Sequence, residues 1–215
     1  TKPPFKAVLC QTRYNYNMKQ QVFVIHGGDA FDTYEEYLAY LKEKEMSIER
    51  TRFIDWKGNL QKALGDSYDV VLPRMPNSQN ARYAEWKIIF DKFVPQLDEN
   101  VIFIGHSLGG IFLAKYLSEE EYPKSIKATL LVAAPYNAPD DHPYVDFNIL
   151  TDLSGLQKRG GKVFLYHSKD DQIVPFTNFE RYQRELPNAT ARTFADKQHF
   201  NQADFPELIS DIQNL

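Results

Sequence analysis

The sequence predicts a single α/β domain with a mainly parallel central sheet and helices on both faces. Apolar runs of strand length alternate with segments of helical periodicity through most of the 215 residues, which is typical of parallel β-α-β folds. Several runs are apolar throughout, as in central strands buried on both faces. A chain of this length buries about 70% of the surface that its unfolded form exposes, so its core needs no disulfide or metal.

In the first half of the chain, the expected strands span residues 22–25, 69–73 and 101–104, and the expected helices span 34–44, 55–65 and 81–97. The first strand is a β-branched apolar run that suits a buried position. Apolar residues at positions 34, 37, 38 and 41 give the first helix a helical spacing. Either Asp32 or Thr33 could cap this helix.

In the second half, we expect a helix over 110–117, strands over 128–134, 162–167 and 189–194, and helices over 178–186 and 205–215. Residues 136–161 are rich in Pro, Asp and Asn and form a longer connection than is usual, which often indicates a functional segment. Met18 stands just before the first strong strand. We therefore expect residues 1–18 to be an appendage on a domain that spans residues 19–215.

Composition excludes several classes of protein. Cys10 is the only cysteine, so an internal disulfide and a cysteine metal cluster are excluded, and a reducing compartment fits. A net charge of −4 with interspersed signs argues against nucleic-acid binding. No apolar run approaches the ~20 residues of a membrane span, and no signal-peptide pattern opens the chain. We expect a soluble, cytoplasmic protein without membrane insertion.

A glycine-flanked serine stands between the predicted strand 101–104 and the predicted helix 110–117. Residues 105–109 read GHSLG and fit the pattern G-x-S-x-G. This strand-serine-helix context is typical of a nucleophile elbow, whose strained turn brings backbone so close that side chains beside the serine would clash. The structural alternative is a serine that only caps the helix. The context favours Ser107 as a nucleophile.

Other reactive groups follow other predicted strands. In a parallel sheet, such groups gather beyond the carboxyl ends of the strands. HGGD follows the first strand at 26–29, SKDDQIVP spans 168–175, and ADKQH spans 195–199. A serine hydroxyl needs a base to remove its proton, and that base needs an acid to orient it. The chain supplies these groups in the order serine, acid, histidine, which is typical of one class of hydrolytic fold.

Three aspartates are candidates for the orienting acid. Asp171 is favoured because it sits on the turn while Val174 and Pro175 re-enter the body of the fold. Asp170 is the alternative. Asp196, on the same predicted loop as His199, is a weaker candidate.

His199 is the predicted base, because it alone of the five histidines combines the loop after the last strand with the required chain order. His106 should point away from the attacking hydroxyl and serve structure. His26 could brace the glycine turn, and His167 should be packed or hydrogen-bonded. His142 falls in the long polar connection, where we expect it to be solvated.

Acyl transfer also needs hydrogen-bond donors for the oxyanion. In this arrangement they are the N–H of the residue after the serine and an N–H in the loop after an early strand. These are Leu108 and Gly28. No HExxH, phosphate loop or G-x-G-x-x-G pattern is present, so we expect neither a metal nor a cofactor.

From about Val22 to Leu215 the sequence resembles the α/β-hydrolase superfamily, and within it the small, lid-poor serine hydrolases related to retinoblastoma-binding protein nine and their bacterial relatives. The residues that carry the resemblance are HGG at 26–28, MPN at 75–77, GHSLG at 105–109, DD at 170–171 ahead of Pro175, QHFN at 198–201 and FPELI at 205–209. The resemblance implies a nucleophile at Ser107, an acid at Asp171 and a base at His199. Residues 1–18 and 136–161 depart from that family's pattern.

These observations predict a serine hydrolase that cleaves small carboxylic esters or thioesters through an acyl-enzyme intermediate on Ser107, as carboxylesterases do. An amide or peptide hydrolase with the same triad is an alternative that sequence cannot separate, because the choice depends on the shape of the pocket. A non-catalytic protein-interaction module on the same fold is a further alternative.

Overall fold

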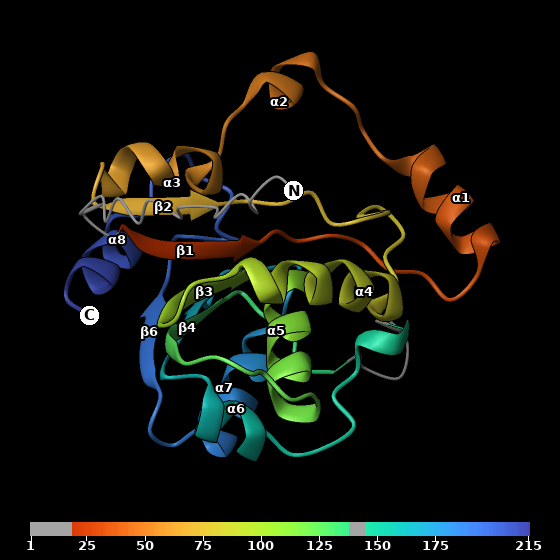
Figure 1. The fold of residues 1–215 in the computed structure, drawn as a ribbon. Coiled ribbons are helices and arrows are strands. Elements are labelled where there is room, and N and C mark those ends of the chain that lie inside the picture. Colours follow the sequence, from red (N-terminus) through yellow and green to blue (C-terminus); the bar gives the residue numbers. More distant parts are fainter. Residues whose placement is uncertain (1–18, 138–144) are drawn as a thin grey trace, which may run out of the picture.

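The computed structural model describes residues 19–137 and 145–215, so the predictions for residues 1–18 and for His142 lie outside the described chain. Within the described ranges, a six-stranded sheet has the order β2-β1-β3-β4-β5-β6 (Figure 1), and every neighbouring pair is parallel. The strands are β1 (Gln20–Ile25), β2 (Tyr68–Val71), β3 (Val101–His106), β4 (Ile126–Val132), β5 (Lys162–Ser168) and β6 (Thr190–Phe194). The predicted α/β class and parallel sheet are confirmed.

The strand order reverses between β1 and β3. The chain steps from β1 outward to β2, then crosses back to β3 on the other side of β1 and continues to β4. Val24 pairs with Ile104, and Ile104 pairs in turn with Leu130. A reversal of this kind leaves a crevice beyond the carboxyl ends of the two central strands, where open α/β sheets bind ligands. The segments after β1 and β3 meet there.

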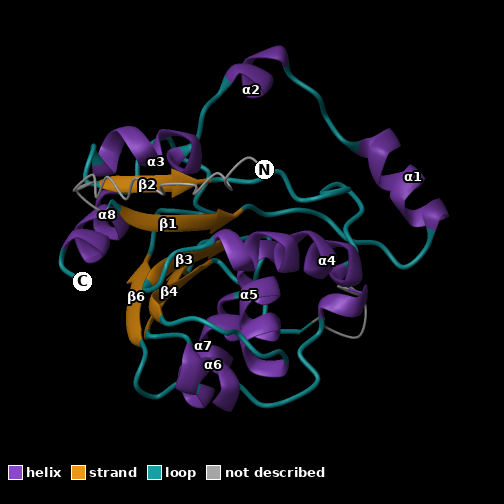
Figure 2. Ribbon diagram, in the orientation of Figure 1, coloured by secondary structure: helices purple, strands orange, loops and turns teal. Residues whose placement is uncertain are grey.

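Two apolar clusters cover the two faces of the sheet, because side chains alternate along each strand. Phe23 and Ile25 of β1 face one cluster, and Val22 and Val24 face the other. The first face is covered by α4 (Tyr83–Phe93), α5 (Leu108–Glu119), α6 (Ser154–Arg159) and α7 (Phe176–Glu185), and the second by α3 (Trp56–Leu64) and α8 (Pro206–Gln213). Figure 2 shows these helices around the central strands.

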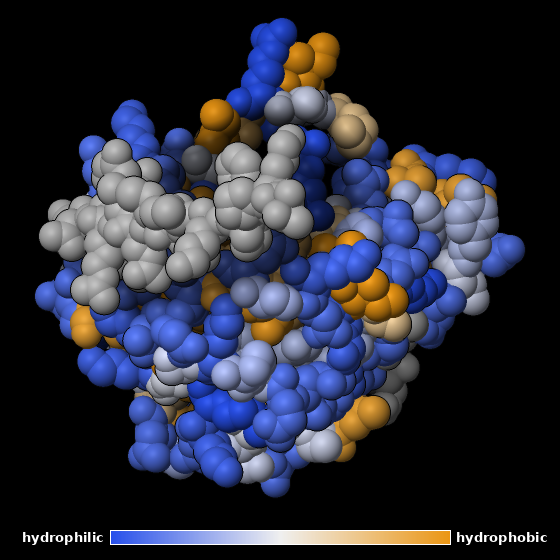
Figure 3. Space-filling model, viewed as in Figure 1, coloured by the Kyte–Doolittle hydropathy of each residue, from blue (hydrophilic) through white to orange (hydrophobic). Residues whose placement is uncertain are grey.

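One segment leaves the body of the domain. Helices α1 (Tyr34–Glu43) and α2 (Ile48–Arg52) project away from the sheet (Figure 1). Thr33 and Glu36 form a reciprocal capping box at the start of α1, but neither helix has a buried residue. Tyr34 is 62% exposed and Met46 is 79% exposed, and Figure 3 shows apolar surface on this segment. The periodic apolar residues that predict α1 therefore do not pack on the core.

Most predicted elements are present with shifted ends, and two short helices were not predicted. Helix α2 has five residues and no apolar periodicity. Helix α6, with its short 3-10 neighbour η2 (Val145–Phe147), lies in the region predicted as one irregular connection. A further 3-10 turn, η1 (Val94–Gln96), ends the helix predicted over 81–97. In the described ranges, no helix is long and apolar enough to cross a membrane.

Candidate active site

Ser107 occupies a strained turn between β3 and α5. Its φ of 54° and ψ of −123° are unfavourable for an L-residue, and such a conformation costs on the order of 1–3 kcal/mol. The Ser107 N–H donates to the Val132 carbonyl oxygen at 2.8 Å. The Ser107 side chain makes no capping hydrogen bond to α5. This geometry does not fit a serine that only caps the helix.

The glycines of GHSLG are required by close backbone approach. A Cβ on Gly105 would collide with the Gly109 carbonyl group, and a Cβ on Gly109 would collide with the Ile25 carbonyl group. The start of α5 therefore packs directly on the ends of β3 and β1. This contact brings the serine turn beside the loop that follows β1.

His199 and Asp171 form a buried hydrogen-bonded pair. His199 Nδ1 lies 2.8 Å from Asp171 Oδ2, and each residue is only 8% exposed. Because a carboxylate only accepts hydrogen bonds, Nδ1 carries the proton and Nε2 is left free to accept one. The other carboxylate oxygen, Oδ1, accepts from the N–H groups of Ile173 and Val174 at 2.9 and 3.0 Å.

The surroundings of Asp171 keep it ionised. Burial is the largest single influence and raises the pKa of this carboxyl group, but the hydrogen bond and charge of His199 and the two N–H groups outweigh it. The net result is a pKa below the usual aspartate value. An ionised Asp171 can hold the His199 ring in one orientation and stabilise its positive form.

The structure separates the candidate acids. Asp170 Oδ1 accepts from the Ser168 hydroxyl at 2.5 Å and from the Gln198 N–H at 2.9 Å, so this carboxylate ties the β5 loop to the His199 loop. Asp196 is exposed. Of the three, Asp171 is hydrogen-bonded to the His199 ring.

The backbone of His199 is held against the serine turn. His106, which directly precedes Ser107, places its Nε2 at 2.8 Å from the His199 carbonyl oxygen, and the two rings are 5.1 Å apart between centroids. Both neighbours of His199 have left-handed backbone, with φ of 47° at Gln198 and 54° at Phe200. The last predicted loop thus packs against His106, the residue that directly precedes the expected nucleophile.

The two predicted oxyanion donors converge on the same turn. A Cβ on Gly27 would lie 3.1 Å from Ser107 Cβ, and one on Gly28 would lie 3.3 Å from the Leu108 side chain. Leu108 is the first residue of α5, so its N–H has no acceptor within the helix. Within residues 19–137 and 145–215, the Gly28 N–H donates to no other group. Both N–H groups are available beside Ser107.

His26 braces the glycine loop. Its Nε2 accepts from the Met75 N–H at 2.9 Å, and its Nδ1 lies 2.6 Å from the Gly27 carbonyl oxygen and donates to it. Burial lowers the pKa of His26, which favours this neutral form. The Asp29 N–H adds a bond to the Ser78 carbonyl oxygen at 2.8 Å. These contacts connect the HGG and MPN motifs and keep the Gly28 N–H in place.

The remaining described histidines have structural contacts. His167 is buried and its Nε2 donates to the Val174 carbonyl oxygen at 2.9 Å, as expected for a packed residue. His106 is also buried, and its Nδ1 contacts the Lys57 ammonium group at 3.3 Å.

Lys57 was not singled out from the sequence, although a signal existed. It lies in the first turn of α3, where a cation opposes the helix dipole. The Lys57 ammonium group is paired with the carboxylate of Asp55, the N-cap residue of the same helix.

Two hollows flank the site but do not contain the triad. One of about 350 Å³ lies between α3 and α8 and is lined by Trp56 and Phe205 among others. Another of about 520 Å³ is polar, and it includes Ser78, whose carbonyl group touches the Gly28 position. In the part of the chain that the structure describes, no group of three His, Cys, Asp or Glu residues could hold a metal.

The sequence and the fold match known proteins along most of the chain. The serine hydrolase family profile matches residues 51–206. YdeN of Bacillus subtilis is 23% identical over 188 residues, covering 85% of each chain, and the serine hydrolase RBBP9 of Rattus norvegicus is 24% identical over 165 residues, covering 74% of this chain and 86% of RBBP9.

Solved structures show the same fold. The crystal structure of the B. subtilis ydeN gene product superposes with a TM-score of 0.67 at 18% identity, covering 91% of this chain and 98% of that one. A mutant of the meta-cleavage product hydrolase CumD superposes with a TM-score of 0.59 at 14% identity, covering 92% of each chain. The family profile spans well over half of the sequence, and the chain therefore belongs to the serine hydrolase family.

Proposed function

We propose that this serine hydrolase cleaves small carboxylic esters or thioesters through an acyl-enzyme intermediate on Ser107. The observation that carries the proposal is the buried Asp171–His199 pair, which is held through His106 against the strained turn of Ser107. A nucleophile, a base and an acid that orients the base are the parts that this chemistry needs.

In the first half of the reaction, Ser107 Oγ attacks the substrate carbonyl carbon and His199 Nε2 takes the hydroxyl proton. Asp171 stabilises the resulting imidazolium. The negative charge that develops on the carbonyl oxygen is accepted by the N–H groups of Gly28 and Leu108. Collapse of the tetrahedral intermediate breaks the ester or thioester bond, and the leaving alkoxide or thiolate takes the proton from His199.

In the second half, water attacks the acyl group while His199 removes one of its protons. The tetrahedral intermediate collapses, Ser107 recovers the proton from His199, and a carboxylic acid leaves. Each oxyanion donor of this kind contributes on the order of 3 kcal/mol to transition-state stabilisation. The His26 contacts hold one of these donors before substrate arrives, so no free energy is needed to orient it during the reaction.

A panel of p-nitrophenyl esters of increasing acyl length tests the proposal, with one amide analogue for comparison. Wild-type protein should hydrolyse at least the short esters faster than the amide. Ser107→Ala and His199→Ala should each reduce kcat by far more than tenfold, because the members of a triad act as a unit. A folded wild-type protein that hydrolyses no ester or thioester, or variants with wild-type rates, would overturn it.

A further inference from the structure

We propose that Lys57 is a positioning residue for this reaction: its ammonium group fixes the His106 ring in the form that holds the His199 backbone beside Ser107. This role rests on the proposed function. Lys57 belongs to α3, and it has no part in the chemical steps described above.

The Lys57 ammonium group is buried and has few contacts. The residue is 8% exposed, and Nζ lies 2.5 Å from Asp55 Oδ2, 3.3 Å from His106 Nδ1 and 5.0 Å from the centre of the Trp56 ring. A buried charge is costly unless it is paired and hydrogen-bonded. Among the described residues, the Asp55 carboxylate pairs it and His106 Nδ1 is the other acceptor within hydrogen-bond distance of Nζ.

These contacts determine the protonation of His106. An ammonium group only donates hydrogen bonds, so His106 Nδ1 must accept and Nε2 must carry the proton. The Nε2–H then donates to the His199 carbonyl oxygen at 2.8 Å. Burial and, after it, the Lys57 charge lower the pKa of His106 well below the usual value, so the ring stays neutral. The other neutral tautomer would turn an acceptor nitrogen toward that carbonyl group.

The His199 loop needs such a support. The left-handed backbone at Gln198 and Phe200 is unfavourable for residues with a side chain and persists only where the surroundings hold it. Asp170 holds the Gln198 N–H on one side. On the α3 side, Trp56 Nε1–H donates to the Phe200 carbonyl oxygen at 2.8 Å, and His106 holds the carbonyl group of His199 itself.

A purely structural role for Lys57 would be to neutralise Asp55. That carboxylate, however, already accepts from the N–H groups of Lys57 and Gly58 at the start of α3. A cap of this kind does not require a lysine. Loss of a purely structural role would leave the protonation of the His106 ring unchanged, whereas loss of the proposed role would change it.

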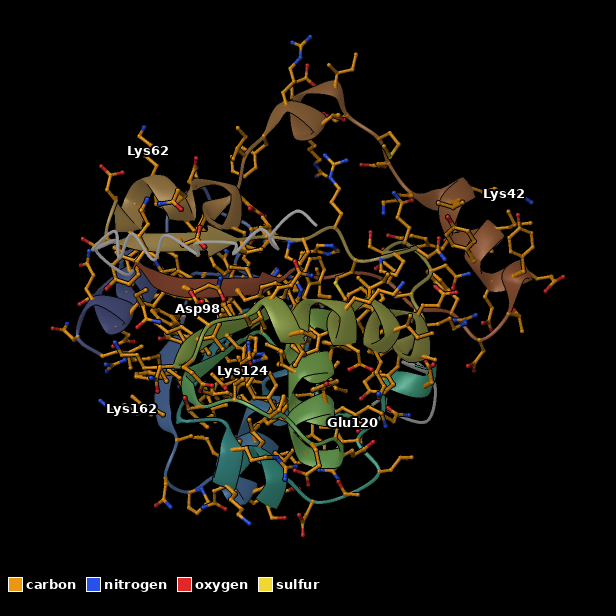
Figure 4. All side chains as sticks on the ribbon, viewed as in Figure 1. Lys42, Lys62, Asp98, Glu120, Lys124 and Lys162 are labelled. Carbon is orange, nitrogen blue, oxygen red and sulfur yellow. The ribbon has the colours of Figure 1, made fainter. Side chains whose placement is uncertain are left out.

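The first test is Lys57→Met, which keeps the length and apolar stem of the side chain and removes its hydrogen-bond donors. The matched control is Lys62→Met on the same helix, where the side chain is exposed and points outward (Figure 4). With a short p-nitrophenyl ester, Lys57→Met should lower kcat by about tenfold to a hundredfold and change KM less than threefold, since a small misplacement of a catalytic group costs about that much. Lys62→Met should keep wild-type kinetics, and Lys57→Arg, which also only donates, should recover part of the lost rate.

A double-mutant comparison tests whether the effect passes through His106. In a His106→Phe background, adding Lys57→Met should lower kcat by less than twofold, because residues that act through one another are not additive. A folded Lys57→Met protein with kcat within twofold of wild type would overturn the proposal. Fully additive losses in the double variant would overturn it as well.

Nitrogen-15 NMR of the histidine rings in the full chain gives a readout that does not depend on turnover. Wild-type His106 should show a protonated Nε2 and an unprotonated Nδ1, and Lys57→Met should give mixed tautomers or a protonated ring. An unchanged His106 signal in a folded Lys57→Met protein would contradict the role of Lys57. If wild-type protein hydrolysed no ester, the proposed function would fail, while the tautomer measurement would still decide whether Lys57 controls His106.

Discussion

The candidate active site contains two strained backbone segments that are supported in different ways. At the serine turn, glycines at 105 and 109 let β3, α5 and the end of β1 approach closely enough to hold Ser107 at its φ of 54°. The glycines that allow the strained turn therefore lie close to Ser107 in the sequence. A short sequence pattern is enough to specify the position of the proposed nucleophile.

The His199 loop has no glycine beside its strained residues, Gln198 and Phe200. Its support comes from three distant places in the sequence: Asp170 after β5, Trp56 in α3 and His106 at the end of β3. The proposed nucleophile is thus placed by local geometry, whereas the proposed base is placed by tertiary contacts. Substitutions near Ser107 should mainly affect chemistry or folding, and those around His199 should mainly affect alignment.

The largest expected effect is the difference in kcat between substitutions of the two neighbouring aspartates, Asp170 and Asp171. Asp171→Asn should reduce kcat by about 10³- to 10⁴-fold, because an amide no longer holds the His199 ring in the required tautomer. Asp170→Asn keeps an acceptor for the Gln198 N–H and should cost only about tenfold, through alignment of the loop. Steady-state kinetics on a short ester measures both, and equal losses would contradict the assigned division of roles.

The glycines of the serine turn should be sensitive to any added side chain. Gly109→Ala places a Cβ against the Ile25 and His26 carbonyl groups and should lower the free energy of unfolding by about 3 kcal/mol, the upper range for overpacking. Gly58→Ala is the control, since a Cβ there meets only the side chain of Ile54, which is exposed and can move. Urea denaturation should show a change of less than about 1 kcal/mol for that control, because Gly58 lies in α3 and alanine favours a helix more than glycine does. Equal losses would indicate that the clash is absent.

Acid should remove part of the stabilisation that Asp171 provides. The pKa of this carboxyl group is lower in the folded than in the unfolded chain, so it stabilises the fold above the unfolded value of about 4. That contribution is lost as the pH falls through the folded pKa. The difference in unfolding free energy between wild type and Asp171→Asn should therefore be largest near pH 7 and shrink toward pH 3 in urea titrations. If this difference in unfolding free energy grew on acidification, it would contradict a lowered pKa of Asp171 in the folded chain.

The smallest expected effect comes from relieving strain in the His199 loop. Gln198→Gly should raise the free energy of unfolding by up to about 1 kcal/mol, since glycine adopts a φ of 47° without steric cost. The same change should lower kcat severalfold, because the loop loses a constraint that holds His199. Thermal unfolding and ester kinetics on one preparation measure both. A variant that is both more active and more stable would show that this strain does not align the base.

How well each part of the molecule could be predicted from the sequence depends on whether local sequence or tertiary contacts place that part. The strands, the serine turn and the chain order of Ser107, Asp171 and His199 are visible in sequence, because each depends on short-range pattern or on the rule that places strand ends together. The sequence favours Asp171 over Asp170, but which atom each of these adjacent carboxylates contacts could be read only from the structure.

Two features could not be predicted from pattern. Lys57 meets His106 across 49 positions of sequence, and that contact depends on how α3 packs against the sheet. Helix α1 has the apolar spacing of a buried helix, yet it projects from the domain with no buried residue. Periodicity predicts which face of a helix is apolar, but it does not show whether anything covers that face.

The most direct test of the central claim is covalent labelling of the nucleophile. A fluorophosphonate should react with the folded wild-type protein at Ser107, and peptide mass spectrometry should locate the phosphonate on that side chain. The Ser107→Ala protein should remain unlabelled under the same conditions. A folded wild-type protein that stays unlabelled at Ser107, or a Ser107→Ala protein labelled to the same extent, would contradict a serine nucleophile in this turn.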